Sequence, residues 1–240
     1  MSFQTVFQRY EMKYLLSMEQ KERLLQAMEP YMALDQYGRT TIRNIYFDTA
    51  DFRLIRRSIE KPAYKEKLRI RSYSQAQPGS TVFVELKKKY KKVVYKRRIS
   101  LPEAEAMEWV CGGRPCRSHS QIAGEVDYFL QYYKALRPAA FLSYEREAFC
   151  SKEPSDFRVT FDDTLLCRRE DMSLESPAYG TPLLPEGQVL MEVKCGGGIP
   201  LWMAHFLSGE QIYQTSFSKY GTAYQTVIFP KLMKEAACHA

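Results

Sequence analysis

Basic side chains recur at every second position in several parts of the chain, and this spacing suits phosphate binding. The longest series consists of Lys65, Lys67, Arg69 and Arg71. Side chains alternate between the two faces of an extended strand, so these four cations would form one row opposite apolar neighbours. Guanidinium groups bind phosphate oxygens bidentately, and ammonium groups add point charge. A solvated basic surface explains any one such strand, whereas a shared pattern over several strands favours an anionic ligand.

Other segments repeat this spacing and place acidic residues among the cations. The further basic positions are Arg9, Lys13, Lys87, Lys89, Lys96, Arg98, Arg146, Arg158 and Lys194. The interleaved acidic positions are Glu11, Glu85, Asp162 and Glu192. Like charges on one sheet face repel unless they face water or surround a polyanion. We expect at least two of the four carboxylates to pair with cations. Asp162 could ligate a second metal ion, orient a water molecule, pair with Arg158 or form part of a turn. Mg²⁺ or Mn²⁺, which prefer carboxylates, would offset phosphate charge.

Alternation of apolar and polar residues predicts the strands that carry these side chains. Eight segments qualify, at residues 7–16, 40–48, 64–73, 82–89, 93–100, 140–149, 157–165 and 189–195. Several are joined by spans too short for a crossover helix, which favours antiparallel pairing. Helices are predicted over 17–28, 102–110 and 119–136 and after residue 218, with a long exposed loop over 169–188.

A barrel of about eight strands can enclose a polar interior filled by ligand and water. We therefore predict an α+β fold, with an antiparallel eight-stranded β tunnel barrel, a polar, cation-lined lumen and helices packed outside. Without a linker or an internal repeat, the chain is expected to form a single domain over residues 1–240.

Composition limits the remaining classes of protein. The 240 residues are 45% hydrophobic and 26% charged, and a net charge of +7 favours an anionic partner. The sequence has no apolar run long enough to span a membrane and no signal peptide. We therefore predict a cytoplasmic protein with six reduced cysteines. The aromatic residues form no evident stacking platform on the basic faces, so nucleic acid is not expected as a partner. The run Gly196-Gly197-Gly198 precedes no Gly-Lys-Ser/Thr and is interpreted as a strand-to-helix connection.

Several short blocks, in order along the chain, resemble the VTC domain. This is the catalytic domain of eukaryotic polyphosphate polymerases and their bacterial relatives, a branch of the triphosphate tunnel metalloenzyme superfamily. The blocks are Arg9-Tyr10-Glu11-Met12-Lys13-Tyr14, Ile45-Tyr46-Phe47-Asp48-Thr49, Leu68-Arg69-Ile70-Arg71, Val84-Glu85-Leu86-Lys87, Tyr95-Lys96-Arg97-Arg98, Tyr144-Glu145-Arg146, Arg158-Val159-Thr160-Phe161-Asp162, Met191-Glu192-Val193-Lys194 and Ser218-Lys219-Tyr220. The first block has Arg-x-Glu-x-Lys where triphosphatases and cyclases of the superfamily have Glu-x-Glu-x-Lys, which favours the VTC branch.

The resemblance implies a tunnel that accepts the triphosphate of ATP, transfers the terminal phosphoryl group to growing polyphosphate and needs Mn²⁺ or Mg²⁺. Carried over by motif, the phosphate contacts would be Lys13, Arg69, Arg71, Lys87, Lys96, Arg146, Arg158 and Lys219, with neutral hydrogen bonds from Tyr144 and Ser218. Glu192 would ligate the metal, and the catalytic set would be Lys13, Arg69, Arg71 and Glu192. Ser218 could also cap a helix whose free amides attract an anion.

Two alternatives remain open from the sequence. A tunnel-fold tripolyphosphatase or nucleoside triphosphatase would use the same cations with water as the acceptor. A non-catalytic module would bind polyphosphate or another polyanion without chemistry. The three histidines, His119, His205 and His239, lie outside every block, so no phosphohistidine step is predicted. In-line transfer between phosphates needs only positioning and electrostatic stabilisation.

Overall fold

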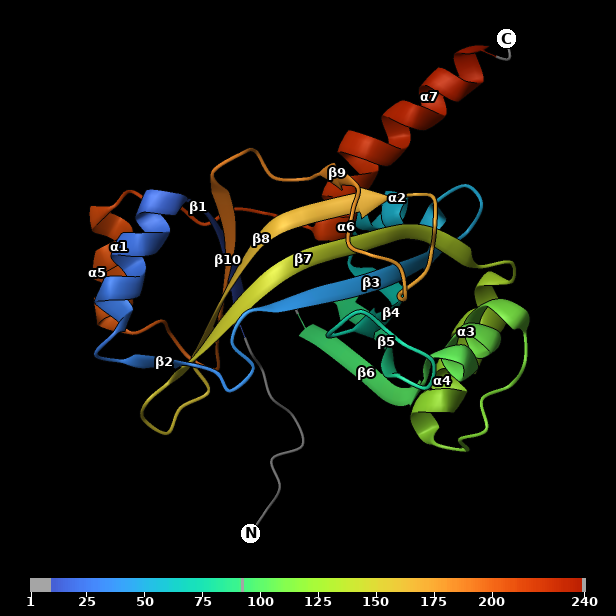
Figure 1. The fold of residues 1–240 in the computed structure, drawn as a ribbon, viewed down its shortest axis with the longest axis horizontal. Coiled ribbons are helices and arrows are strands. Elements are labelled where there is room, and N and C mark those ends of the chain that lie inside the picture. Colours follow the sequence, from blue (N-terminus) through green and yellow to red (C-terminus); the bar gives the residue numbers. More distant parts are fainter. Residues whose placement is uncertain (1–9, 92, 239–240) are drawn as a thin grey trace. The chain divides into compact units, whose positions relative to one another are not determined.

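The computed structural model describes residues 10–91 and 93–238 and has an α+β fold with a large antiparallel sheet (Figure 1). Hydrogen bonds connect its main strands in the order β1-β10-β8-β7-β3-β4-β5-β6, while β2 pairs with β7 and β9 pairs with β8. The ten strands are β1 (Tyr10–Ser17), β2 (Met32–Leu34), β3 (Thr40–Asp48), β4 (Tyr64–Ser72), β5 (Thr81–Tyr90), β6 (Val93–Pro102), β7 (Arg137–Ser151), β8 (Arg158–Arg168), β9 (Thr181–Pro182) and β10 (Gln188–Cys195).

Short helices connect and flank these strands. They are α1 (Met18–Met28), α2 (Arg53–Ile59), α3 (Glu103–Gly112), α4 (Gln121–Tyr133), α5 (Leu201–Gly209), α6 (Lys219–Ala223) and α7 (Phe229–Cys238), with a π-helical turn η1 (Tyr224–Ile228) between the last two. None of the described helices is long and apolar enough to cross a membrane.

All eight predicted strands are present, with ends that shift by a few residues. The first one was predicted to begin at residue 7, which lies outside the described residues together with Arg9, Lys92 and His239. The short strands β2 and β9 and the helix α2 were not predicted. Ten paired strands replace the eight-stranded sheet, and the closed tunnel with its lumen stays a prediction.

The chain forms two compact units. The first unit contains Met1–Thr40, Tyr144–Leu165 and Leu184–Phe217, and the second contains Thr41–Ser143, Leu166–Leu183 and Ser218–Ala240. A single domain over residues 1–240 therefore remains a prediction.

In the first unit, one face of the β1-β10-β8 strands is apolar and is covered by α1 and α5, which lie side by side in Figure 1. The core joins Tyr14, Phe161 and Met191 of the strands to Leu24 and Met203 of the two helices. Ser17 begins α1 as predicted, because its hydroxyl accepts the Gln20 amide while the Gln20 side chain accepts the Ser17 amide. This one-sided core leaves the charged side chains of the same strands on the opposite face.

In the second unit, β3-β4-β5-β6 have the same division into faces. Leu68 and Ile70 of β4 pack with Val84 of β5 against Trp109 of α3 and Phe129 of α4. Because side chains alternate along each strand, the basic row of β4 lies on the other face. The core thus fixes which side of the sheet carries the cations.

The segment between β8 and β10 is not simply the exposed loop that was predicted. Leu174 is fully buried in the core of the second unit, and the short strand β9 pairs with β8. The buried guanidinium of Arg168 donates hydrogen bonds to the carbonyl oxygens of Asp171, Ser173, Pro177 and Tyr179. A side chain thereby organises backbone that forms little regular structure of its own.

Candidate functional site

The polar face of the first unit carries alternating charges on β1 and β10. Lys13 lies across from Glu192, and Glu11 lies across from Lys194 in the antiparallel register. The Lys13 ammonium is 3.4 Å from a carboxylate oxygen of Glu11 and 3.5 Å from one of Glu192. It also donates a 2.9 Å hydrogen bond to the carbonyl oxygen of Phe217. These contacts hold one cation between two carboxylates.

Arg146 on β7 extends this cluster toward β8. Its guanidinium donates hydrogen bonds of 2.6 Å to each oxygen of Asp162 and lies 3.4 Å from Glu192. Burial opposes the charged form of Arg146, but the surrounding acidic groups outweigh it and raise its pKa well above the ordinary value. Asp162 therefore pairs with Arg146, a partner that the sequence analysis did not name.

The carboxylates on this face fit a divalent metal ion that takes most of its other ligands from phosphate and water. Within the described residues, no group of three or more His, Cys, Asp or Glu side chains could hold a metal ion. Glu192 and Glu11 nevertheless supply two carboxylates on neighbouring strands, and Mg²⁺ commonly uses one or two carboxylates plus substrate phosphates. The Thr160 hydroxyl across from Glu192 is buried and has no hydrogen-bond partner in the described part of the chain. The hydroxyl is therefore available to form a hydrogen bond with an oxygen ligand or a water molecule.

Two further predicted residues lie in the same unit. Tyr144 is buried, and the guanidinium carbon of Arg146 lies 5.2 Å from the centre of its ring. Arg158 is opposite Lys194 on the polar face, but its side chain is half exposed and lies 3.7 Å from Asp35. Of the predicted residues in this unit, the structure brings Lys13, Glu192 and Arg146 into direct contact.

The polar face of the second unit is organised around one buried carboxylate. Glu85 of β5 lies across from Arg69 of β4 and from Arg98 of β6. Its oxygens are 2.6 Å from the Arg69 guanidinium, 2.7 Å from the Lys96 ammonium, 3.4 Å from Arg98 and 4.0 Å from Arg71. Four cations therefore share one carboxylate, which leaves an excess of positive charge on this face.

The charges of this cluster shift one another's protonation. Burial raises the pKa of Glu85, but the positive charges of Arg69, Arg71 and Lys96 outweigh it and lower that pKa to about 2. Burial also lowers the pKa of Lys96, and its contact with Glu85 opposes the change. Glu85 is thus ionised throughout the neutral range. Together with Asp162, it confirms the prediction that at least two of the four interleaved carboxylates pair with cations.

Neutral groups of β3 complete the second cluster. The Asn44 side-chain oxygen accepts a 2.8 Å hydrogen bond from Arg71, and the Tyr46 hydroxyl accepts a 2.9 Å hydrogen bond from Arg69. Burial raises the pKa of Tyr46, but Arg69 and Arg71 outweigh it, so the net pKa is lowered. Both arginines are therefore held on two sides, by β3 and by β5.

Tyr46 in turn stacks on Tyr220 of α6, with ring centres 4.7 Å apart. The Tyr220 hydroxyl donates a 3.0 Å hydrogen bond to Asp48, a fully buried carboxylate that also accepts the amides of Thr49, Leu54 and Ile55. Burial raises the pKa of Asp48 against these hydrogen bonds. The carboxylate thus ties α2 and α6 to the end of β3, next to the basic row.

The remaining predicted residues lie on β5 and at α6. Ser218 caps α6, because its hydroxyl accepts the Gly221 amide at 3.1 Å, and it also accepts a 3.0 Å hydrogen bond from the Lys67 ammonium. Lys219 follows it as the first residue of the helix. Lys87 lies across from Lys67 on one side and from Lys96 on the other. The structure thus adds Lys67 to the predicted set of cations.

Several residues of these clusters were not among the predicted phosphate and metal contacts. They are Asn44, Tyr46, Lys67, Arg98 and Thr160. Face alternation placed Lys67 and Arg98 in the basic rows without giving them a contact, and Thr160 lies at an alternate position of a strand that was singled out. Asn44 and Tyr46 contact the basic row only through the register between β3 and β4, which the sequence does not reveal.

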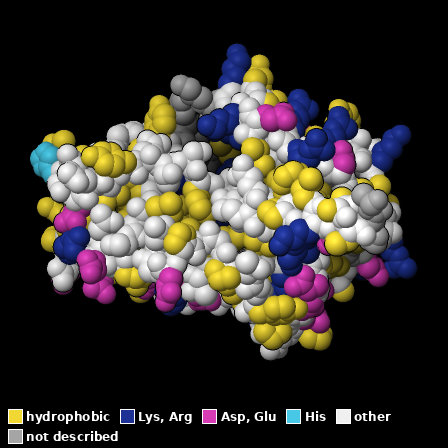
Figure 2. Space-filling model, turned by 90° about the horizontal axis from the view of Figure 1, so that it is seen from above, with side chains coloured by type: hydrophobic (Ala, Val, Ile, Leu, Met, Phe, Trp, Pro, Cys, Tyr) yellow, Lys and Arg dark blue, Asp and Glu magenta, His cyan; other side chains and the backbone are white. Residues whose placement is uncertain are grey.

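Figure 2 shows one face of the molecule, on which Lys and Arg side chains stand singly or in small groups among apolar and acidic ones. No continuous basic patch covers the described residues in that view. The dense grouping of cations is instead the one built by strand alternation on the polar faces of the sheet.

The chain was compared with known families and structures. The family model described as the VTC domain matches residues 8–228. A crystal structure of a candidate adenylate cyclase from Bacillus halodurans is similar, with a TM-score of 0.53 and 18% identity, over 87% of this chain and 92% of that one. A Hippeastrum protein, described as a candidate adenylyl cyclase that reveals a dominant triphosphatase activity, has a TM-score of 0.51 and 15% identity, over 91% and 96% of the two chains. No curated protein matches significantly.

These similarities agree with the expectation drawn from the sequence blocks. The structural likenesses show that this chain shares its fold with these two proteins. The family match extends over nearly the whole described chain, including every strand of both polar clusters. The chain belongs to the VTC domain family.

Proposed function

We propose that this protein is a metal-dependent polyphosphate polymerase, which transfers the terminal phosphoryl group of ATP to a growing polyphosphate chain within a basic tunnel. The observation that carries the proposal is the second polar cluster, where Arg69, Arg71, Lys96 and Arg98 share the single carboxylate of Glu85. An excess of cations at a partly buried sheet face is costly unless an anion compensates it. A polyphosphate or triphosphate chain supplies repeated negative charge in the form that guanidinium groups bind best.

In this proposal the residues act by positioning and by charge. An acceptor phosphate oxygen forms a bond to the terminal phosphorus of ATP while the bond to the ADP oxygen breaks. Arg69 and Arg71, held from two sides, would orient phosphate oxygens without reorganising during the transfer. Lys96 would add point charge to the developing negative oxygens. No protein nucleophile is needed for this step.

The first polar cluster would serve the metal and the phosphates around it. Glu192, assisted by Glu11, would hold Mn²⁺ or Mg²⁺, and Lys13 and Arg146 would neutralise phosphate oxygens beside it. When bound, such an ion would offset the charge of the phosphate oxygens. Lys13 would keep the two carboxylates close while the ion is absent, because its ammonium lies between them.

A hydrolase is the second candidate, favoured by the Hippeastrum protein of the same fold that is described as having a dominant triphosphatase activity. The same cations would bind the triphosphate, and water would replace polyphosphate as the acceptor. Binding of a polyanion without chemistry is the third. The polymerase is preferred because the family match is to the VTC domain over residues 8–228.

One experiment separates the three. The purified protein is incubated with ATP and Mn²⁺, and the products are resolved by gel electrophoresis and phosphorus NMR. Long-chain polyphosphate with matching ADP, lost on chelation by EDTA, is the expected result. Orthophosphate alone would indicate the triphosphatase, and unchanged ATP with tight polyphosphate binding would indicate the binding module. Cyclic AMP with pyrophosphate would instead indicate the chemistry named for the Bacillus halodurans protein.

The variant Glu192→Ala tests the metal role in the same assay. We expect it to lose most activity, by about 100-fold or more, because the charge of the ion is no longer held at the phosphates. Glu147→Ala is the matched control, since Glu147 is also a partly buried, ion-paired carboxylate of the first unit but pairs with Lys21. Full activity in Glu192→Ala, or an equal loss in Glu147→Ala, would contradict the assignment.

A further inference from the structure

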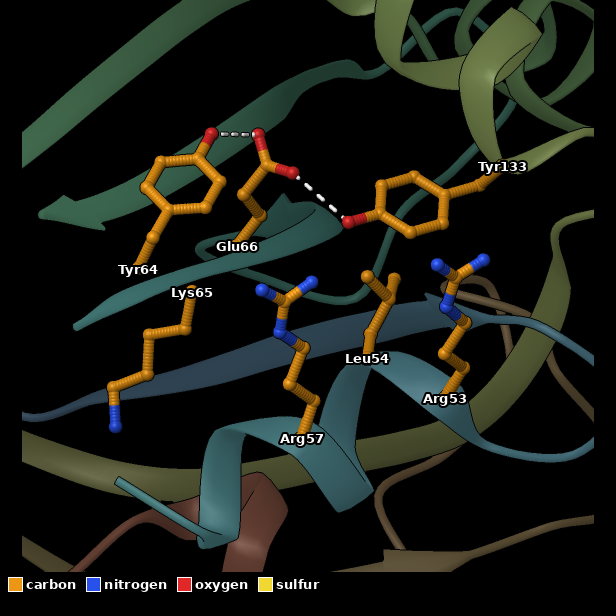
Figure 3. Close-up of a pocket in the computed structure, with 7 residues that line it drawn as sticks. All are labelled: Arg53, Leu54, Arg57, Tyr64, Lys65, Glu66 and Tyr133. Carbon is orange, nitrogen blue, oxygen red and sulfur yellow. Dashed lines mark hydrogen bonds between the residues drawn. The ribbon is translucent and has the colours of Figure 1, made fainter. Parts of the chain in front are cut away.

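A pocket in the second unit lies apart from the cluster around Glu85. It is lined by Arg53, Leu54, Arg57, Tyr64, Lys65, Glu66 and Tyr133 (Figure 3). Tyr64 and Glu66 share the face of β4 that carries Leu68, whereas Arg69 and Arg71 occupy the opposite face. None of the residues assigned above to triphosphate binding lines this pocket.

One wall of the pocket is a carboxylate held by two hydroxyl groups. Tyr64 donates a 2.5 Å hydrogen bond to one oxygen of Glu66, and Tyr133 donates a 3.0 Å hydrogen bond to the other. Burial and the contact with Glu66 raise the pKa of both tyrosines, so their hydroxyls stay protonated at neutral pH. Both carboxylate oxygens of Glu66 therefore already accept a hydrogen bond, and these bonds distribute its negative charge.

The facing wall carries two arginines. Arg53 and Arg57 lie one turn apart on α2, and Figure 3 shows their guanidinium groups on either side of Leu54, pointing toward Glu66 and Tyr133. The guanidinium carbon of Arg53 lies 5.6 Å from the centre of the Tyr133 ring. Neither arginine forms an ion pair with another described residue. Because each guanidinium has five N–H donors, the pocket has many more donors than acceptors.

We propose that this pocket binds the phosphate group of a small anion, as a second anion site distinct from the basic cluster. Two guanidinium groups against one hydroxyl-bonded carboxylate give a net positive charge. A tetrahedral phosphate offers enough acceptor oxygens to engage both arginines, whereas a carboxylate has only two. The cavity has a volume of about 10 Å³, which is room for about one water, so the phosphate would bind at its mouth, where both arginines are exposed. The ligand class is inorganic phosphate, pyrophosphate or the end of a polyphosphate chain.

Calorimetric titration with pyrophosphate tests the site on the intact protein. We expect two binding events in the wild type and the loss of one in Arg53→Gln combined with Arg57→Gln, with affinity there reduced about tenfold or more. Arg56→Gln is the matched control, because Arg56 lies on the same helix, is exposed and does not line the pocket. An unchanged isotherm in the double variant, or an equal loss in the control, would overturn the proposal.

A second measurement needs no variant. Pyrophosphate should shift the Nε–Hε signals of Arg53 and Arg57 in a nitrogen–proton NMR spectrum, while that of Arg56 stays in place. Titrations with orthophosphate and tripolyphosphate then distinguish a free phosphate from a chain end as the preferred ligand. ATP turnover is measured separately and should be unchanged by the double substitution. If none of the three anions at saturating concentration changes the chemical shifts of the Arg53 and Arg57 signals, the site is refuted, whatever the outcome of the polymerase assay.

Discussion

Replacing Glu85 by glutamine removes the one negative charge around which the second cluster is built, while keeping the shape of the side chain. The pKa of Glu85 is lowered from 4.5 to about 2 by Arg69, Arg71 and Lys96, even though its side chain is buried. At about 1.4 kcal/mol per pKa unit, this difference corresponds to about 3 kcal/mol in favour of the ionised form in the folded protein. We therefore expect Glu85→Gln to lower the free energy of unfolding at pH 7 by about 3 kcal/mol.

The same reasoning fixes the pH dependence. Because the folded pKa lies below the unfolded one, the contribution of Glu85 is fully present above about pH 4.5 and is lost as the pH falls toward 2. Urea unfolding of wild type and variant at several pH values measures it. The difference between the two proteins should shrink from about 3 kcal/mol at pH 7 to a small value near pH 2.5, since other carboxylates titrate in both.

Glu125→Gln is the control for this experiment. Glu125 also contacts two cations, Lys88 and Arg97, but on α4 and with more solvent around it. Its loss should cost less than about 1 kcal/mol. Tripolyphosphate should raise the melting temperature of Glu85→Gln more than that of the wild type, because the cations have lost their carboxylate. A variant within about 1 kcal/mol of wild type at pH 7, or a difference that persists at low pH, would refute the reasoning.

Two further substitutions test the surroundings of this cluster. Arg69→Ala combined with Arg71→Ala should weaken tripolyphosphate binding by about 100-fold or more and make its salt dependence shallower, as measured by titration at several salt concentrations with circular dichroism as the check of folding. Unchanged affinity would mean that these arginines do not contact the ligand. Tyr220→Phe removes one donor from the buried Asp48 and should cost about 1 to 2 kcal/mol in urea unfolding, whereas Tyr213→Phe, at an exposed position, should cost nothing measurable. Equal stability of the two tyrosine variants would argue against a role for the Asp48 hydrogen bond.

The strands were predictable because each has one face in a core, which forces alternation into the sequence. The missed helix α2 shows where this logic ends. Its first turn has no side-chain cap of its own, and Phe52 before it has a left-handed backbone with φ of 58°. The cap comes instead from the end of β3, where Asp48 accepts the Leu54 and Ile55 amides, and from Thr49 directly after it, whose hydroxyl accepts the Arg53 amide. Local capping signals could not have revealed a cap supplied by the preceding strand.

The candidate site was predictable to the same extent. Alternation assigned the cations to one face of each strand, and the structure bears this out in both units. The partners of each cation depend on register, which local sequence does not encode. Asp162 illustrates this limit, because the sequence left it between a metal, a water, pairing with Arg158 and a turn, and it pairs with Arg146. Likewise, nothing local shows that Glu85 lies opposite both Arg69 and Arg98.

The two polar faces differ in charge balance, and this difference separates their roles. On β1 and β10, Glu11 and Glu192 alternate with Lys13 and Lys194, so two carboxylates remain close to two cations. Around Glu85, four cations share one carboxylate. In the proposed function, the balanced face would hold the divalent ion, and a polyanion would compensate the positive charge of the unbalanced one. Substitutions in the first unit should therefore change the metal concentration needed for activity, and substitutions around Glu85 should change anion affinity and its dependence on salt.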